Sequence, residues 1–221
     1  FFHQDIYGKI SFAGGNGSKL DVFGFNFTDN VDFQNVAEID WSSSGGGLNF
    51  SLIPRANNMV VNGKFNLSGY DISIDEGGDD EIRESSINGY EIGLNFNYFG
   101  NNRELNYGFE LSGFNTVFDF TNFQGIGFSE EQNTTEIGAF VSYRQVIGGL
   151  VIEPGLRFQY YNAQGTGRVE PRVGVKYNLT DNIRLKAGGG LYSQNFLSTS
   201  NDRDVVNLFY GFLTGPEDIP E

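Results

Sequence analysis

The stretch from Val151 to Gly190 constrains the fold most, because apolar residues alternate there with charged residues and glycines over three successive segments. One face of the first segment would carry Leu150, Ile152, Pro154, Leu156, Phe158 and Tyr160. The opposite face would carry Val151, Glu153, Gly155, Arg157, Gln159 and Tyr161. Residues 168–177 and 183–192 repeat this rule. A period of two predicts β-strands with one apolar and one polar face.

The polar faces of these three segments carry both signs of charge. Neighbours on one face of a sheet can pair across strands, so we predict an ion-paired wall that faces water or another polar body. Its members are Glu153, Arg157, Arg168, Glu170, Arg172, Lys176, Arg184 and Lys186. Two interpretations stay open: the wall keeps a wet interior polar, or it contacts a body docked inside.

Further segments alternate in the same way, which indicates about ten strands and an almost all-β protein. Several would run about 13 to 18 residues, longer than the usual five or six of soluble sheets. Short turns between them alternate with longer polar links, which is typical of an up-and-down meander. Within residues 61–74 the apolar positions change phase, and we therefore predict a β-bulge near Ser68 and Gly69.

Composition excludes several classes of protein. The net charge of −14 argues against a nucleic-acid partner, because phosphate binding needs a clustered basic surface. The sequence has no Cys and a single His, His3, so it holds no thiolate nucleophile and no multi-histidine metal site. We expect no enzyme activity, no cofactor and no metal. No run approaches the roughly 18 apolar residues of a membrane-spanning helix, so strands would have to cross any membrane.

An ordered series of short motifs carries a family resemblance. In chain order these are Gly155-Leu156-Arg157-Phe158, Glu170-Pro171-Arg172, Asp181-Asn182, Leu185-Lys186-Ala187-Gly188 and Ser193-Gln194. The series resembles the barrel of TonB-dependent outer-membrane receptors, particularly the Bacteroidetes type that often carries a carboxypeptidase-regulatory-like extension. The resemblance implies an all-β, antiparallel up-and-down transmembrane β-barrel of about 22 strands around a plug. This chain would supply about ten of them.

The same resemblance implies a domain organisation and a function. Residues 1–221 would be a partial β-barrel domain, with the plug domain and the terminal strands outside the sequence. The parent would be a receptor in the outer membrane of a Gram-negative bacterium that takes up a scarce nutrient, such as a siderophore, cofactor, glycan or peptide, by plug-gated, energised transport. Its partners would be outer-membrane lipid, the TonB complex through the plug, a surface lipoprotein and the small nutrient ligand. The charged wall would contact the plug.

Long loops at one end of the strands would contact the ligand. The aromatic segment that contains Phe120, Phe123 and Phe128 supplies the candidate residues, because binding residues concentrate on loops. Two rival functions remain: a passive porin or structural outer-membrane barrel, and a soluble β-rich binding or adhesin module.

Two prolines restrict how the predicted strands can pair with their neighbours. Pro154 and Pro171 fall on the apolar face of strands that should pair on both edges, where a missing N–H is costly. We therefore expect each of them near a strand end or a bulge.

Overall fold

The computed structural model describes residues 1–34, 37–55, 58–75, 82–121, 126–193, 196–199 and 211–214. Ten strands form one antiparallel sheet in which each strand pairs with the next in chain order. They are β1 (Phe2–Ala13), β2 (Lys19–Phe33), β3 (Ala37–Leu52), β4 (Met59–Asp75), β5 (Ile82–Phe99), β6 (Arg103–Thr121), β7 (Gly127–Ile147), β8 (Leu150–Tyr161), β9 (Thr166–Asn178) and β10 (Arg184–Gly190). A separate hairpin pairs β11 (Phe196–Thr199) with β12 (Gly211–Thr214). The all-β, up-and-down prediction is confirmed.

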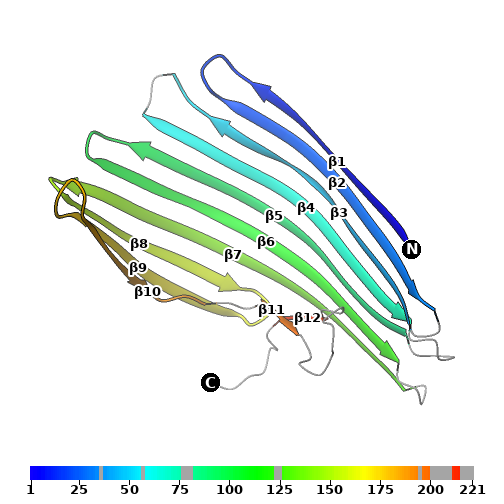
Figure 1. Ribbon diagram of the computed structural model, residues 1–221. Helices are drawn as coiled ribbons and strands as arrows, with labels where there is room; N and C mark the ends of the chain where they lie inside the picture. The colour runs from blue at the N-terminus through cyan, green and yellow to red at the C-terminus, as the bar shows by residue number, and fades with distance from the viewer. Residues whose placement is uncertain are drawn as a thin grey trace.

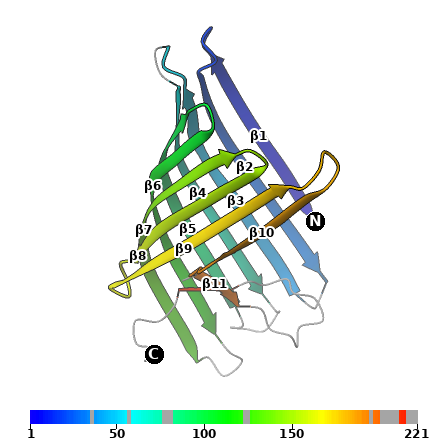
Figure 2. The same ribbon diagram turned by 90° about the vertical axis from the view of Figure 1, so that its left-hand side faces the viewer.

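The sheet curls into the wall of a barrel, with β1 and β10 at its two edges (Figures 1 and 2). We call one end of the strands the turn end, where residues 14–18, 53–58, 100–102, 148–149 and 179–183 connect them. The opposite, projecting end carries the connections 34–36, 76–81, 122–126 and 162–165. No helix in the described ranges is long and apolar enough to cross a membrane.

The convex face has an apolar part and a polar part, and β7 shows both. Toward the turn end its outward residues are Ile137, Ala139, Val141, Tyr143, Gln145 and Ile147. Ten steps of about 3.3 Å along a strand tilted by about 40° cover about 25 Å, the height of the apolar band of an outer-membrane barrel. Toward the projecting end the outward residues are Gly127, Ser129, Glu131, Asn133 and Thr135. This second part suits water, so β7 extends well beyond the apolar band.

The concave face, which we call the lumen face, shows the opposite order of polarity. Near the turn end it carries amides and charges, whereas toward the projecting end of β3, β4 and β6 it carries apolar and aromatic side chains. On β7 the lumen face stays polar there, with Glu130 and Gln132. On β4, Phe65 and Leu67 point outward and are 38% and 50% exposed, but Ile72 and Ile74 point inward and are 4% and 7% exposed. The apolar face therefore switches sides along the strand, at the level where the apolar band of the convex face ends.

This switch corrects the predicted bulge. The register of β4 with both neighbours is constant from one end to the other, so Ser68 and Gly69 lie in a regular strand opposite Gly45 and Ser44. The change of phase in the sequence is real, but it moves the apolar residues from the convex face to the lumen face. A bulge would have kept them on one face.

The predicted long links are also wrong in length. The connections at the projecting end span three to six residues, much like the two to six residues at the turn end. The polar segments next to them belong to the strands, and β2 to β7 are 15 to 21 residues long. At the tightest turn, between β7 and β8, Gly148 has a φ of 58°, which glycine adopts without strain.

The two prolines interrupt ladders without shifting the register. Pro154 lies inside β8, not near an end, and residues 153–154 have no partner in β7 although pairing continues in the same register on both sides. The expectation for Pro154 is therefore wrong. Pro171 also lies within β9, but its ladder with β10 stops there: the Leu191 N–H donates to the Pro171 carbonyl, and Pro171 has no N–H to return.

Candidate functional site

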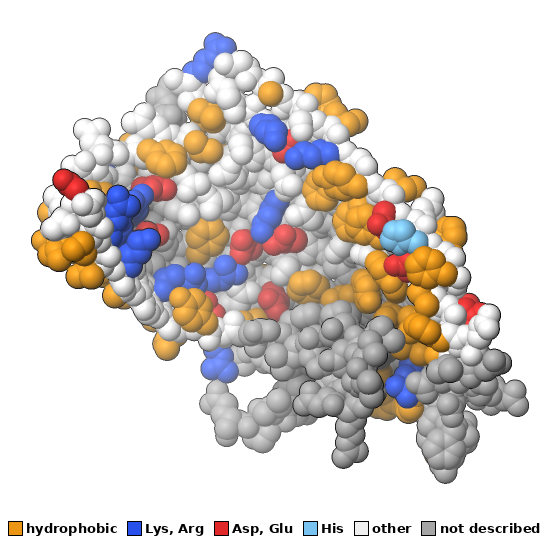
Figure 3. Space-filling model, in the orientation of Figure 1, with side chains coloured by type: hydrophobic (Ala, Val, Ile, Leu, Met, Phe, Trp, Pro, Cys, Tyr) orange, Lys and Arg blue, Asp and Glu red, His pale blue; other side chains and the backbone are white. Residues whose placement is uncertain are grey.

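The register places the eight predicted wall residues on the lumen face of β8, β9 and β10. Charged side chains gather in the hollow of the sheet in Figure 3. Arg157 lies directly opposite Glu170, and an Arg172 Nη lies 3.3 Å from a Glu170 carboxylate oxygen. The ion-paired wall is thus present around these three residues. Arg168 lies opposite Gln159.

A second part of the wall centres on Glu110 of β6. One Glu110 oxygen lies 3.5 Å from the Lys64 Nζ, and the other lies 2.9 Å from an Arg157 Nη. Lys64 also pairs with Glu91 at 2.5 Å, and Arg157 donates to the side chain of Gln159 at 3.1 Å. One network of charges and amides therefore joins β4, β5, β6 and β8.

Two glycines let these cations cross an intervening strand. A Cβ on Gly93 of β5 would lie 2.7 Å from the Lys64 Cε, so the Lys64 chain passes directly over that glycine toward β6. A Cβ on Gly138 of β7 would lie 3.1 Å from an Arg157 Nη, and the guanidinium passes over it from the other side. Because glycine has no side chain, Lys64 and Arg157 can both reach the carboxylate of Glu110.

Lys64, Glu91 and Glu110 are not among the wall residues predicted from the sequence. Alternation alone puts each of them on the polar face of its strand, so that signal was available. What alternation does not show is a contact between residues two strands apart, because it depends on the glycine in the strand between them.

Glu170 also anchors the chain that follows β10. This carboxylate is 5% exposed and accepts hydrogen bonds from the backbone N–H and the hydroxyl of Ser193. The Ser193 hydroxyl lies 2.9 Å from that of Tyr161. The chain thus turns onto the lumen face where the β9–β10 ladder ends, and farther on β12 lies against β5, β6 and β7.

Three predicted cations have a different environment. Lys176 lies directly opposite Lys186, and Arg184 lies opposite Asn178. No ion pair joins any of the three to another residue within the described ranges. Like charges that face each other across strands are destabilising, so this patch near the turn end of β9 and β10 favours an anionic neighbour.

The aromatic side chains gather in the projecting half of the lumen face. The ring centroids of Trp41 and Tyr70 lie 6.3 Å apart, and those of Phe118 and Phe128 are also 6.3 Å apart. Phe120 and Phe128 lie in strands, directly opposite each other in the β6–β7 ladder, rather than in a loop. Phe123, the third predicted ligand contact, lies outside the described residues.

His3, at the edge of this half, is held by two carboxylates. Its Nδ1 lies 2.7 Å from an Asp29 oxygen and its Nε2 lies 3.1 Å from an Asp5 oxygen. The hydrogen bond and charge of Asp29, with the charge of Asp5, raise the pKa of His3 above its ordinary 6.5. No group of three or more His, Asp or Glu residues in the described part of the chain is arranged to hold a metal ion.

Comparison with known proteins decides the family. The model of the family "TonB dependent receptor-like, beta-barrel" matches residues 2–216. The chain belongs to this family. Its fold is similar to that of the Serratia marcescens hemophore receptor HasR, solved in complex with its hemophore HasA and heme, with a TM-score of 0.70 and 13% identity over 84% of this chain. It is also similar to the outer membrane transporter YddB from Escherichia coli, with a TM-score of 0.61 and 11% identity over 78% of this chain.

The likeness to both solved receptors covers only part of their length. This TonB-dependent receptor-like barrel spans 35% of the HasR chain and 29% of the YddB chain. No curated protein matches the sequence. Ten up-and-down strands that cover about a third of such receptors confirm the prediction of a segment from a larger barrel.

Proposed function

We propose that this barrel belongs to an outer-membrane receptor of a Gram-negative bacterium, of the Bacteroidetes type, that takes up a scarce nutrient by plug-gated, energised transport. The observation that carries the proposal is the change of polarity along the strands. Near the turn end the convex face suits lipid and the lumen face is charged. At the projecting end the convex face suits water, and the lumen face of β3, β4 and β6 carries aromatic and apolar side chains. Such a wall offers a ligand surface outside the membrane and a wet passage through it.

The ligand would contact the aromatic lumen face at the projecting end. Phe120 and Phe128 stay candidates for this contact because they lie on that face beside Phe118. Phe123 remains a candidate from its place in the sequence. HasR was solved with a hemophore and heme, which supports a partner protein or a small ligand for this barrel. A surface lipoprotein above the strands is a further proposed partner.

The eight charged residues of β8, β9 and β10 would contact a plug domain inside the lumen. Most of this contact would be made by the three cations that lack ion-pair partners in the described part of the chain, Lys176, Arg184 and Lys186. The TonB complex would move the plug and supply the energy. The work is differential binding between two plug positions, with no covalent step.

The test compares uptake in four strains: the parent, a strain without the full-length gene, the complemented strain, and the complemented strain without TonB. Labelled probes are an iron–siderophore complex, heme, a corrinoid, a neutral oligosaccharide and a peptide. We expect the deletion to abolish uptake of one of them, and the gene to restore it only when TonB is present. Uptake that continues without TonB would identify a passive pore.

Neighbouring residues of β6 provide a matched pair of variants for the ligand surface. Phe118 points to the lumen and Val117 points outward. Phe118→Ala should weaken binding of the identified ligand about tenfold, because a buried aromatic contact is worth on the order of 1–2 kcal/mol. Val117→Ala should leave binding unchanged. Equal effects of the two changes would contradict a ligand surface on the lumen face.

A further inference from the structure

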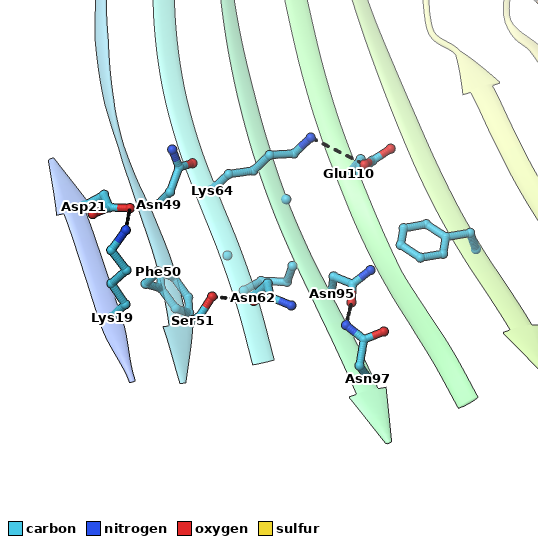
Figure 4. A pocket seen from close by; sticks show the side chains of 14 residues that line it. Lys19, Asp21, Asn49, Phe50, Ser51, Asn62, Lys64, Asn95, Asn97 and Glu110 are labelled. Atoms are coloured by element: carbon cyan, nitrogen blue, oxygen red, sulfur yellow. Dashed lines mark hydrogen bonds and ion pairs between the residues drawn. The ribbon is translucent and has the colours of Figure 1, made fainter. Parts of the chain in front are cut away.

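A polar hollow opens on the lumen face of β2 to β7, in the half of the wall near the turn end (Figure 4). Its volume is about 410 Å³, within the usual range for small-molecule sites. None of the eight predicted wall residues lines it. The lining includes Asn49, Ser51, Asn62, Asn95 and Asn97. No established role covers this group of amides.

The charged residues that line the hollow are already neutralised. Lys19 lies 2.9 Å from Asp21, and Lys64 lies 3.5 Å from Glu110. Glu110 has a second cation, Arg157, at 2.9 Å. An ionic ligand would have to break one of these pairs to gain a partner of its own. The charge pattern therefore favours a ligand without net charge.

The amides, in contrast, keep unused hydrogen-bonding groups. Asn62 accepts a hydrogen bond from Ser51 at 2.6 Å, and no described residue accepts from its Nδ2. Asn97 donates to Asn95 at 2.6 Å and leaves its own Oδ1 free. The side chain of Asn49 makes no hydrogen bond with any described residue. Donors and acceptors are thus both available, and hydroxyl groups can satisfy both kinds.

One aromatic ring completes the lining. Phe140 of β7 lies on the lumen face among these polar residues, and a Cβ on Gly108 would lie only 2.8 Å from its Cζ. The missing side chain of Gly108 therefore leaves room for the tip of the ring over β6. A sugar ring has hydroxyl groups around its edge and an apolar face of C–H groups, which pair with amides and with an aromatic ring respectively.

We propose that this hollow binds a sugar unit of a neutral oligosaccharide, with Phe140 against the ring face and Asn49, Asn62 and Asn97 at the hydroxyl groups. The proposal rests on the proposed function, since the ligand must enter the lumen, and it names the substrate class that this wall favours. The hollow would be a sugar-binding site inside the lumen, beside the β8–β10 surface that is proposed to contact the plug.

The test is calorimetric binding to the purified full-length receptor. The probes are maltohexaose, cellohexaose, xylohexaose and mannohexaose, with the neutral peptide Ala-Ala-Ala as a comparison. We expect at least one oligosaccharide to bind and the peptide not to bind. Asn62→Leu and Phe140→Ala should each lower the affinity about tenfold, the usual effect of losing one hydrogen bond or one ring contact.

Matched controls separate binding from folding. Asn178→Leu changes the same residue type on the lumen face of β9, outside the hollow, and should leave affinity unchanged. Phe140→Trp keeps an aromatic ring and should retain binding where Phe140→Ala loses it. The proposal is overturned if no oligosaccharide binds, if the peptide binds instead, or if the hollow variants and Asn178→Leu behave alike.

These outcomes are independent of the uptake test. TonB-dependent uptake of heme or a siderophore, without oligosaccharide binding, would refute the sugar site and leave the transport proposal intact. Oligosaccharide binding that depends on Asn62 and Phe140, together with uptake that needs no TonB, would refute energised transport and leave the sugar site intact.

Discussion

Substituting Arg for Val141 tests whether the convex face between Ile137 and Ile147 lies in lipid. Val141 is 43% exposed on the convex face and lies near the middle of this apolar band. An Arg at the midplane of a barrel's lipid face costs about 2–4 kcal/mol of folding free energy. We expect Val141→Arg to lower the free energy of unfolding in lipid by that amount.

Ser129→Arg is the matched control on the same strand and the same face. Ser129 lies twelve residues toward the projecting end, about 40 Å away at 3.3 Å per residue, and directly opposite Asp119. An Arg there would lie in water next to a carboxylate. We expect the free energy of unfolding to change by no more than about 0.5 kcal/mol.

Both values come from equilibrium unfolding of the full-length protein in phosphatidylcholine vesicles, with denaturant and tryptophan fluorescence. A third variant, Ile137→Arg, lies at the edge of the band and should cost about 0–1 kcal/mol. A cost that is the same at positions 129, 137 and 141 would refute the assignment of the lipid band. So would a cost below about 1 kcal/mol for Val141→Arg.

Three further predictions concern the lumen face and the strand backbone. Gly108→Ala should destabilise the barrel by about 1–3 kcal/mol, because the new Cβ would collide with the Leu94 carbonyl oxygen. At Gly189 a new Cβ would meet open space. Gly189→Ala should therefore be close to neutral in the same unfolding assay. Glu110→Gln should cost about 1 kcal/mol, since it weakens two partly exposed ion pairs; no change would mean that these pairs contribute nothing. Asp29→Asn should lower the pKa of His3 toward 6.5 in an NMR titration, because the carboxylate raises it. The contribution of protonated His3 to stability is complete below about pH 6.5 and disappears as the pH rises through the raised value.

The half of the wall near the turn end is well predicted from the sequence. In β8 and β9, Leu156, Phe158 and Val173 are 44–47% exposed on the convex face, while the charged residues face the lumen. Strict alternation of apolar and charged residues fixes which side chains share a face of the sheet. It therefore predicts one apolar face and one charged face. The number of strands and their order followed from the same pattern.

The projecting half could not be predicted from one strand at a time. A change of phase such as that between Leu67 and Ile72 fits either a bulge on one face or a regular strand whose surroundings change. Only the constant register across β3, β4 and β5 distinguishes the two. The polar residues of the outward face also lack the apolar signal by which strands are recognised, so the sequence predicts loops where the strands in fact continue.

The projecting strands have a consequence for how a ligand would be recognised. Aromatic side chains such as Trp41 and Phe118 stand on regular strands that continue from the membrane band. Groups on strands are held more precisely than groups on loops. In the proposed receptor, the aromatic surface would therefore be largely formed before the ligand arrives, and less ordering free energy would be lost on binding.

The charges of the lumen face further limit how a body inside the barrel could be held. Glu110 pairs with both Lys64 and Arg157, and Lys64 also pairs with Glu91. These two cations and two carboxylates balance, so little charge is left there for a partner. Lys176 and Lys186, in contrast, face each other without an ion pair in the described part of the wall. In the proposed function, a plug held by these cations would be attached to one side of the lumen, through its carboxylates. Because such contacts weaken with salt, the plug could leave β9 and β10 while the wall of β4 to β8 keeps its own pairs and its shape.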